Sequence, residues 1–339
     1  MDVLQELVMG KPLWMWALFM TIVVVLLALD LGLFHRKARE IGVTESLVLS
    51  GFYITIGLIF GAWVWSNLGP ISGKEYLTGF VVEKTLAMDN IFVISLVFSY
   101  LGIPRLYQHR VLFWGILGVI ALRGIVIGLG AVLVANFGWV LYIFALLLIA
   151  TGIKMLLVGD HVPDIEKNPA LKLMRRWLRI TPELHGNRFF VRRPDPTTGT
   201  IATWVTPLFV AMVLIEIVDL IFALDSVPAI FAITTDPFIV YTSNIFAVLG
   251  LRALYFALAA VIDRFSYLKQ ALALVLVFIG SKIFVADIAG WEKFPAAVSL
   301  GVTLALIAGG VAYSLWRTRR QPAVSSQSTL HKPQRNSWH

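Results

Sequence analysis

The chain has 339 residues and no cysteine. Without thiols it forms neither disulfides nor thiolate metal sites, and iron–sulfur clusters are excluded as well. Charge is also scarce, since 14% of the residues are Asp, Glu, Lys or Arg, against roughly 25% in an ordinary soluble domain. The Gly-x4-Gly-Lys-Ser/Thr loop that cradles nucleotide phosphates is missing, so we expect no activity driven by ATP hydrolysis.

Apolar residues make up 58% of the chain, and the mean hydropathy is +0.82. A soluble core of this size cannot enclose so many apolar side chains, and the few charged residues cannot cover its surface. The composition therefore predicts an all-α polytopic membrane protein. It excludes a soluble enzyme, and we expect neither an enzyme activity nor a bound cofactor.

Nine stretches are apolar over about the 20 residues that a helix needs to cross a bilayer. They cover roughly residues 12–34, 46–68, 77–101, 111–135, 139–158, 203–232, 238–262, 268–288 and 294–316. The predicted organisation is two N-terminal peripheral spans (1–76), a first core unit (77–158), a cytoplasmic loop (159–202), a second core unit (203–288), a ninth span (289–316) and a disordered tail (317–339).

The distribution of basic residues predicts the orientation. If the N-terminus lies outside, 20 of the 28 Lys and Arg residues fall on inward-facing segments and 3 on outward-facing ones. Cytoplasmic segments of membrane proteins are enriched in Lys and Arg, so this split favours nine spans with the N-terminus outside and the C-terminus inside. The same rule accounts for the net charge of +8, and we expect no nucleic-acid partner.

The cytoplasmic loop contains two predicted elements. Asn168 and Pro169 precede apolar residues at helical spacing among Lys172, Arg175 and Arg176, which predicts a basic amphipathic helix on the inner leaflet. Residues 187–203 contain two short extended runs around an Asp-Pro-Thr-Thr-Gly turn, which predicts a small hairpin.

Polar residues within the spans reveal an internal repeat. The third and sixth spans each carry an acid, five residues, an aspartate and a small oxygen-bearing side chain: Glu83, Asp89 and Asn90, then Asp219, Asp225 and Ser226. The next two spans of each unit carry, in order, Arg123 and Lys154, then Arg252 and Lys282. Because each unit has three spans, the second copy is inverted relative to the first. Inverted repeats are typical of secondary transporters, whose substrate site lies where the repeats meet.

The repeated acids predict a cation site. Together with Glu216, one turn before Asp219, the six motif residues offer an oxygen-rich cage of the kind that Mg²⁺, Ca²⁺ or Mn²⁺ prefers. Acids six residues apart on a regular helix diverge by about 120°, so we expect a helix break at Pro228 to help them converge. In the competing interpretation, Arg123 and Arg252 form structural ion pairs with these acids, and Lys154 and Lys282 snorkel at the span ends.

These motifs resemble the TerC family of integral membrane proteins, in particular its Alx-like members within the LysE-like transporter superfamily. The resemblance rests on EKTLAMDN at 83–90, FSYLGIPRLYQHR at 98–110, EIVDLIFALDSVP at 216–228 and residues 231–255. It implies a bacterial inner-membrane protein tied to manganese efflux and places the family's acidic motif on Glu83, Asp89, Asn90, Glu216, Asp219, Asp225 and Ser226. The family's older labels are tellurium resistance and membrane-bound redox modulation. The redox label fits poorly with a chain that lacks cysteine.

The sequence and the resemblance together predict a multi-pass transporter that exports Mn²⁺, with Ca²⁺ as a second candidate substrate. Exporting a divalent cation from a negative interior costs about 4.6 kcal/mol per 100 mV, so we expect coupling, with protons as the counter-ion. The expected partners are the cation, protons and the lipid bilayer. Two alternatives are a scaffold that supports metal loading or stress resistance through the inner loop, and a membrane redox enzyme.

Overall fold

The computed structural model describes residues 5–30, 42–157, 168–194, 199–258, 268–291 and 294–320. Long helices make up most of this part of the chain, as the composition predicts. The helices are α1 (Leu13–Leu29), α2 (Val43–Leu68), α3 (Pro70–Tyr100), α4 (Arg105–Asn136), α5 (Val140–Leu157), α6 (Pro169–Trp177), α7 (Pro207–Ile233), α8 (Pro237–Leu249), α9 (Leu251–Leu258), α10 (Leu268–Ile288) and α11 (Ala296–Arg320). Two antiparallel hairpins complete it: β1 (Leu7–Val8) with β2 (Lys11–Pro12), and β3 (Phe190–Pro194) with β4 (Ile201–Val205).

Six described helices are long and apolar enough to cross a membrane, namely α2, α4, α5, α7, α10 and α11. The bent pair α8–α9 is a seventh candidate span. The 17-residue α1 is short for a span, and α3 carries charged side chains at several positions along its length. The structure confirms the all-α polytopic class, whereas the count of nine spans and the orientation stay predictions.

Proline and glycine set the helix boundaries. Gly69 has a φ of +91° between α2 and α3, a conformation that residues with a Cβ seldom adopt, and Pro70 then starts α3. Gly102 has a φ of +62° after α3, and the amide of Ile103 donates back to the carbonyl of Phe98 at 2.9 Å, as in a Schellman cap. These tight turns make consecutive helices antiparallel.

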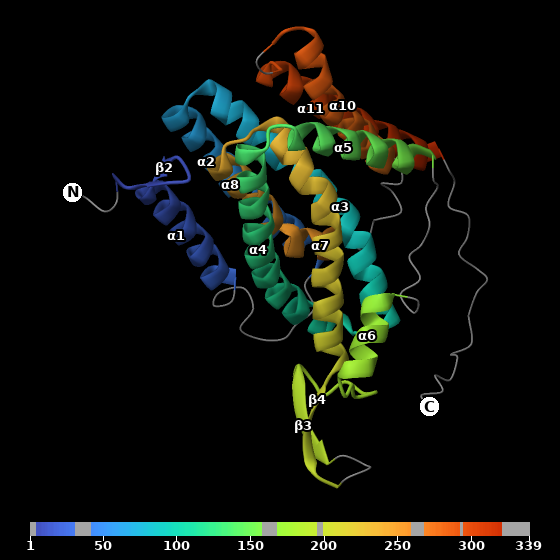
Figure 1. Cartoon of the computed structure of the whole chain (residues 1–339). Coiled ribbons are helices and arrows are strands. Elements are labelled where there is room, and N and C mark those ends of the chain that lie inside the picture. Colours follow the sequence, from blue (N-terminus) through green and yellow to red (C-terminus); the bar gives the residue numbers. More distant parts are fainter. Residues whose placement is uncertain are drawn as a thin grey trace.

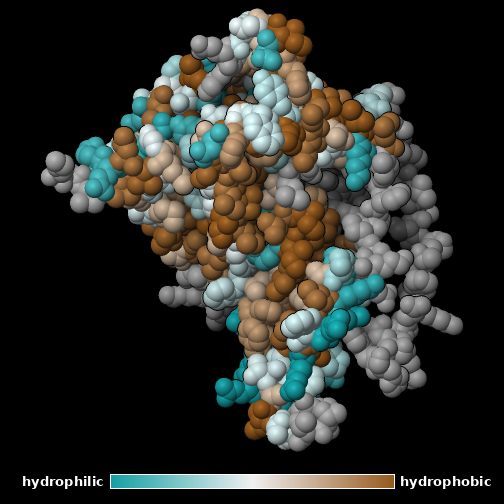
Figure 2. All heavy atoms as spheres, viewed as in Figure 1, coloured by the Kyte–Doolittle hydropathy of each residue, from teal (hydrophilic) through white to brown (hydrophobic). Residues whose placement is uncertain are grey.

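The centre of the bundle is formed by α3, α4, α7 and α8. Helix α4 packs along α7, and α3 packs along α2, α7 and α8. In Figure 1, α4 and α7 run side by side through the middle of the molecule, with α6 and the β3–β4 hairpin at their lower end. Helices α5, α10 and α11 gather at the upper end. Apolar side chains gather over the middle of the face seen in Figure 2, and hydrophilic ones collect over α6 and the hairpin.

Helix α1 joins this centre through aromatic packing. The ring of Phe246 on α8 lies 5.7 Å from that of Phe19 on α1 and 4.7 Å from that of Phe60 on α2. All three side chains are buried, and aromatic pairs at such distances add to the stabilisation from burial.

The helix and the hairpin predicted within residues 159–202 are confirmed. Helix α6 begins at Pro169, and the side chain of Asn168 caps it by accepting the amide of Ala170 at 2.9 Å. Its buried residues are Leu171 and Met174, while Trp177 is 77% exposed. The hairpin β3–β4 follows and leads directly into α7.

The predicted helix break at Pro228 is wrong. Helix α7 continues through Pro228 to Ile233. The break lies instead at Gly250, where α8 and α9 meet at a bend of 40°. The ammonium of Lys84 on α3 donates to the carbonyl of Ala247 at 2.9 Å, and its Nζ would be 2.8 Å from a Cβ on Gly250. A buried cation at the last turn of α8 stabilises the negative end of that helix.

Candidate cation site

The guanidinium of Arg123 joins the two predicted units of the chain. It reaches from α4 to Glu83 on α3, with which it forms a short ion pair, and to Asp219 on α7, whose Oδ1 lies 3.2 Å from Nη2. Arg123 and Glu83 are each 2% exposed. A buried ion pair is stable only when hydrogen bonds satisfy its remaining polar atoms, so the neighbouring side chains matter.

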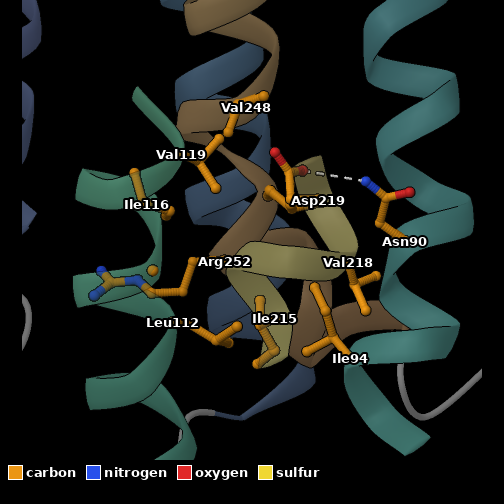
Figure 3. Close-up of a pocket in the computed structure, with 12 residues that line it drawn as sticks. Asn90, Ile94, Leu112, Ile116, Val119, Ile215, Val218, Asp219, Val248 and Arg252 are labelled. Carbon is orange, nitrogen blue, oxygen red and sulfur yellow. Dashed lines mark hydrogen bonds between the residues drawn. The ribbon is translucent and has the colours of Figure 1, made fainter. Parts of the chain in front are cut away.

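Two asparagines complete this network. Asn244 on α8 accepts from Arg123 Nη1 at 2.5 Å and donates to Glu83 Oε2 at 3.0 Å. Asn90 on α3 donates to Asp219 Oδ1 at 3.4 Å, which Figure 3 shows as a dashed line. Four helices therefore meet at one buried polar centre. Asn244 was not among the residues predicted from the sequence, although an asparagine in an apolar stretch is a signal that could have indicated it.

Glu216 stands apart from the network. Both of its carboxylate oxygens are buried, and neither has a hydrogen-bond partner within the described part of the chain. The carboxylate lies against α4 at Gly118, where an added Cβ would be 2.5 Å from Oε1. An unsatisfied buried carboxylate is costly in a folded protein, so this group needs a cation or a proton.

Ser226 lies beside Glu83 on the adjoining face of α7. Its hydroxyl oxygen is buried and has no hydrogen-bond partner within the described part of the chain. Asp89 and Asp225 belong to α3 and α7, but their side chains lie outside the described part of the structure. Of the seven predicted ligands, the structure therefore describes the side chains of five: Glu83, Asn90, Glu216, Asp219 and Ser226.

A small cavity of about 30 Å³ adjoins Asp219 and Asn90, with room for about one water molecule. Its other walls are apolar side chains of α3, α4, α7, α8 and α9, and Arg252 lies at its margin (Figure 3). No three described His, Asp or Glu side chains are close enough together to hold a metal ion. Arg123 instead lies between the two closest acids.

The four basic residues of the predicted repeat, Arg123, Lys154, Arg252 and Lys282, have separate surroundings. Arg123 is in the network. Arg252 forms an ion pair with Asp30 at the end of α1, and its guanidinium lies 5.9 Å from the ring centroid of Phe113. Lys154 is exposed near the end of α5, and Lys282 is buried in a different cavity. In this structure Arg123 therefore forms the ion pairs with the repeated acids that the competing interpretation expects. Arg252 pairs instead with the buried Asp30.

Helices α5 and α10, one from each predicted core unit, meet in a reciprocal way. A Cβ on Gly152 of α5 would lie 2.6 Å from the carbonyl oxygen of Ala273 on α10, and a Cβ on Gly280 would lie 2.6 Å from that of Ala145 on α5. In each helix the contacted alanine lies seven residues before the glycine. The two contacts are thus related by an approximate two-fold axis between the helices, as expected for paired repeats.

The chain matches the integral membrane protein TerC family over residues 68–322. It is 49% identical over 302 residues to an uncharacterized membrane protein of Rickettsia bellii, covering 89% of this chain and 97% of the relative. It is 46% identical over 319 residues to the uncharacterized membrane protein STKORF319 of Myxococcus xanthus, covering 94% and 97% of the two chains.

A third relative is the putative membrane-bound redox modulator Alx of Escherichia coli, 42% identical over 316 residues, covering 91% of this chain and 95% of the relative. No solved structure matches the chain. The family match extends over three quarters of the sequence and includes every residue of the buried network described above. The chain is an integral, multi-pass membrane protein of the TerC family.

Proposed function

We propose that this protein is a secondary transporter of the inner membrane that exports divalent cations in exchange for protons. Mn²⁺ is its main substrate and Ca²⁺ its second. The observation that carries this proposal is that three buried carboxylates, Glu83, Asp219 and Glu216, outnumber the one arginine, Arg123, which pairs with only two of them. Ionisable groups at membrane depth are costly and usually mark an ion pathway.

The charge balance suits an exchange of one metal ion for two protons. Glu83, Asp219 and Glu216 carry three potential negative charges, and Arg123 supplies one positive charge. For these described side chains the remaining charge is −2, which one divalent cation or two protons cancel equally. Carboxylate, amide and hydroxyl oxygens are ligands that suit Mn²⁺ and Ca²⁺. A site that alternates between these two neutral states performs antiport.

Arg123 acts as a tethered cation in the empty site. It bridges an acid of the first unit and an acid of the second, where an incoming metal ion would need the same oxygens. Metal binding therefore requires the guanidinium to withdraw, and this withdrawal would loosen the contact between α3 and α7. Such a change in an interhelical ion pair is a means of linking occupancy to alternating access.

The packing supports two inverted units of three spans each. Helix α4 of the first unit packs along α7 of the second, and α3 of the first packs along α8 of the second. The reciprocal contacts of Gly152 and Gly280 have the same symmetry. We assign the core to residues 77–158 and 203–288, within nine spans that place the N-terminus outside and the C-terminus inside.

The test is Mn²⁺ flux in proteoliposomes under an imposed pH gradient. Wild-type protein should move Mn²⁺ against the proton flow, and flux should fall when the gradient is collapsed. Glu216→Gln is the sharpest variant, because it removes a charge without leaving a described ion-pair partner unsatisfied. Asp89→Asn and Asp225→Asn test the rest of the motif. Glu183→Gln, an exposed carboxylate in the loop, is the matched control and should transport normally.

One observation favours a second candidate, a scaffold that binds a partner at the inner face. Trp177 on α6 and Ile201 on β4 are 77% and 76% exposed, beside the basic residues of this region. If the protein is a scaffold, substitutions in α6 or the β3–β4 hairpin should abolish its function, whereas Glu216→Gln should not. Absent flux in folded wild-type protein would favour the scaffold over the transporter. The redox role in the name of the Escherichia coli relative predicts a bound chromophore, which a visible absorption spectrum would reveal.

A further inference from the structure

A second, larger cavity lies at the end of the bundle opposite α6 and β3–β4. Its volume is about 420 Å³, and it lies among the ends of α3, α5, α7, α10 and α11. Most of its wall is apolar, but seven Asp, Glu, Lys, Ser or Thr side chains also line it. These are Glu75, Thr78, Thr234, Thr235, Lys282, Asp287 and Ser299.

Two of these side chains are charged and buried. Glu75 is 7% exposed and Lys282 is 5% exposed. The Lys282 ammonium donates to the hydroxyl of Ser299 at 3.1 Å, and the Glu75 carboxylate has no hydrogen-bond or ion-pair partner among the described side chains. The two groups are close enough to interact electrostatically but do not form a direct ion pair. Both charged side chains therefore line the cavity without pairing directly.

This cavity lies along the same interface between α3 and α7 as the candidate cation site. Helices α3 and α7 run antiparallel, and their contacts follow in order: Asn90 with Asp219, then Glu83 with Ser226. Gly79 meets Ile230 next, where a Cβ on the glycine would lie 2.7 Å from the Ile230 Cδ1. Beyond this tight apolar contact the same two helices line the cavity with Glu75 and Thr234.

The two sites are therefore neighbours separated by one apolar barrier. Eight residues of α3 separate Glu75 from Glu83, which is about 12 Å along a helix axis. A metal ion with one shell of water has a radius of about 3.5 Å and a volume of about 180 Å³. It fits the larger cavity with its water but cannot fit the 30 Å³ cavity beside Asp219 unless it is dehydrated.

We propose that this larger cavity is an outer vestibule in which a hydrated divalent cation binds at Glu75, with Lys282 weakening that binding so that the ion is released. This inference rests on the proposed export function. The net charge of Glu75, Asp287 and Lys282 is −1, which attracts a cation. The fixed ammonium lowers the attraction, as an exit site requires, because an ion must bind weakly enough to leave.

The absence of native cysteine allows a direct test. Thr235 lines the cavity and is exposed, so Thr235→Cys introduces one thiol at its mouth. In right-side-out vesicles, a membrane-impermeant maleimide should modify this thiol, and Mn²⁺ or Ca²⁺ should slow the modification. Ser66→Cys, exposed on α2 outside the cavity, is the control. It should react at a rate that neither ion changes, which excludes direct binding of metal to the thiol.

Two charge variants in the Thr235→Cys background complete the experiment. Glu75→Gln should abolish the protection by Mn²⁺. Lys282→Met should lower the half-protecting concentration about threefold, as expected when one positive charge is removed at several ångströms from a divalent ion. Protection that persists in Glu75→Gln, or an unchanged concentration in Lys282→Met, would contradict the assigned roles.

Flux measurements separate this inference from the proposed function. Wild-type Mn²⁺ flux without protection of Thr235→Cys would overturn the vestibule and leave transport intact. Protection that depends on Glu75, in a protein without flux, would retain the binding site and overturn the transporter. Modification of Thr235→Cys from the inner side alone would contradict the outward placement of this cavity.

Discussion

The carboxylate of Glu216 on α7 occupies the space that a side chain on Gly118 of α4 would fill. A Cβ on Gly118 would lie 2.5 Å from Oε1 and 2.7 Å from Oε2. No real Cβ sits so close to an oxygen, so the glycine is what allows the acid to reach this position. The contact links a small residue on α4 to a candidate ligand on α7.

Gly118→Ala should therefore displace Glu216 and reduce Mn²⁺ flux at least about tenfold, a change of about 1.4 kcal/mol. Helix propensity alone favours the alanine by about 1 kcal/mol, so the fold should persist. Gly128→Ala on the same helix is the matched control, because a Cβ there meets nothing within 4 Å. Equal flux in both variants would mean that the position of Glu216 is unimportant for transport.

Arg123→Gln should tighten Mn²⁺ binding and slow turnover. The substitution removes the guanidinium that competes with the metal for Glu83 and Asp219, but it also removes the charge that neutralises the empty site. Loss of one partner from a buried ion pair costs about 3–5 kcal/mol, so the variant should melt at a lower temperature without metal. Mn²⁺ should then raise its melting temperature more than that of the wild type.

Lys154→Gln is the control for this experiment, since Lys154 is exposed on α5. Its melting temperature and its response to Mn²⁺ should match the wild type. A weaker response of Arg123→Gln to Mn²⁺ than that of wild type would assign Arg123 a purely structural role.

Much of the site was predictable because charged residues in membrane spans are few. Glu83, Asp219 and Arg123 were all identified from their repeated spacing, and the structure brings them into contact. The hairpin and α6 were predictable as well, since both rely on local turn and capping signals. The convergence of α3, α4, α7 and α8 could not be predicted from the sequence, because it depends on packing between segments far apart in the chain.

The position of the broken helix shows where local rules fail. Proline inside an isolated helix costs about 3 kcal/mol, which predicted a break at Pro228. In the bundle, α7 packs against α3, α4, α5 and α10 and remains helical through the proline. The break falls instead at Gly250, where the ammonium of Lys84, a residue distant in sequence, satisfies a carbonyl of the last turn of α8. The sequence of α8 alone could not indicate that Lys84 of α3 would bind this carbonyl.

Asn244 belongs to the network but not to the repeated motif, and Asn244→Leu tests its role. The leucine would leave one oxygen of Glu83 and one N–H of Arg123 without a partner, at a cost of about 1–3 kcal/mol in the free energy of unfolding. Mn²⁺ flux should fall as well, because the Glu83 carboxylate loses its orientation. Denaturation of the purified protein and proteoliposome flux measure the two effects.

The neighbouring Ser243→Ala is the comparison. The Ser243 hydroxyl donates only to carbonyls of its own helix, at Ile239 and Val240, so we expect less than about 1 kcal/mol for its loss. Similar costs for the two variants would indicate that Asn244 is no more than a buried polar residue.

The final prediction concerns the close contact between α5 and α10. Gly152→Ala and Gly280→Ala each place a methyl group 2.6 Å from a backbone carbonyl of the facing helix. A backbone cannot move aside as a flexible side chain can, so each substitution should force the helices apart and destabilise the protein by about 1–3 kcal/mol. Because the two contacts are reciprocal, the two costs should be nearly equal, as measured by thermal unfolding in detergent. Gly301→Ala on α11, where a Cβ meets nothing within 4 Å, should be neutral or slightly stabilising. Unequal costs for Gly152→Ala and Gly280→Ala would show that the two units do not share this interface symmetrically, and would remove the main structural support for an inverted repeat.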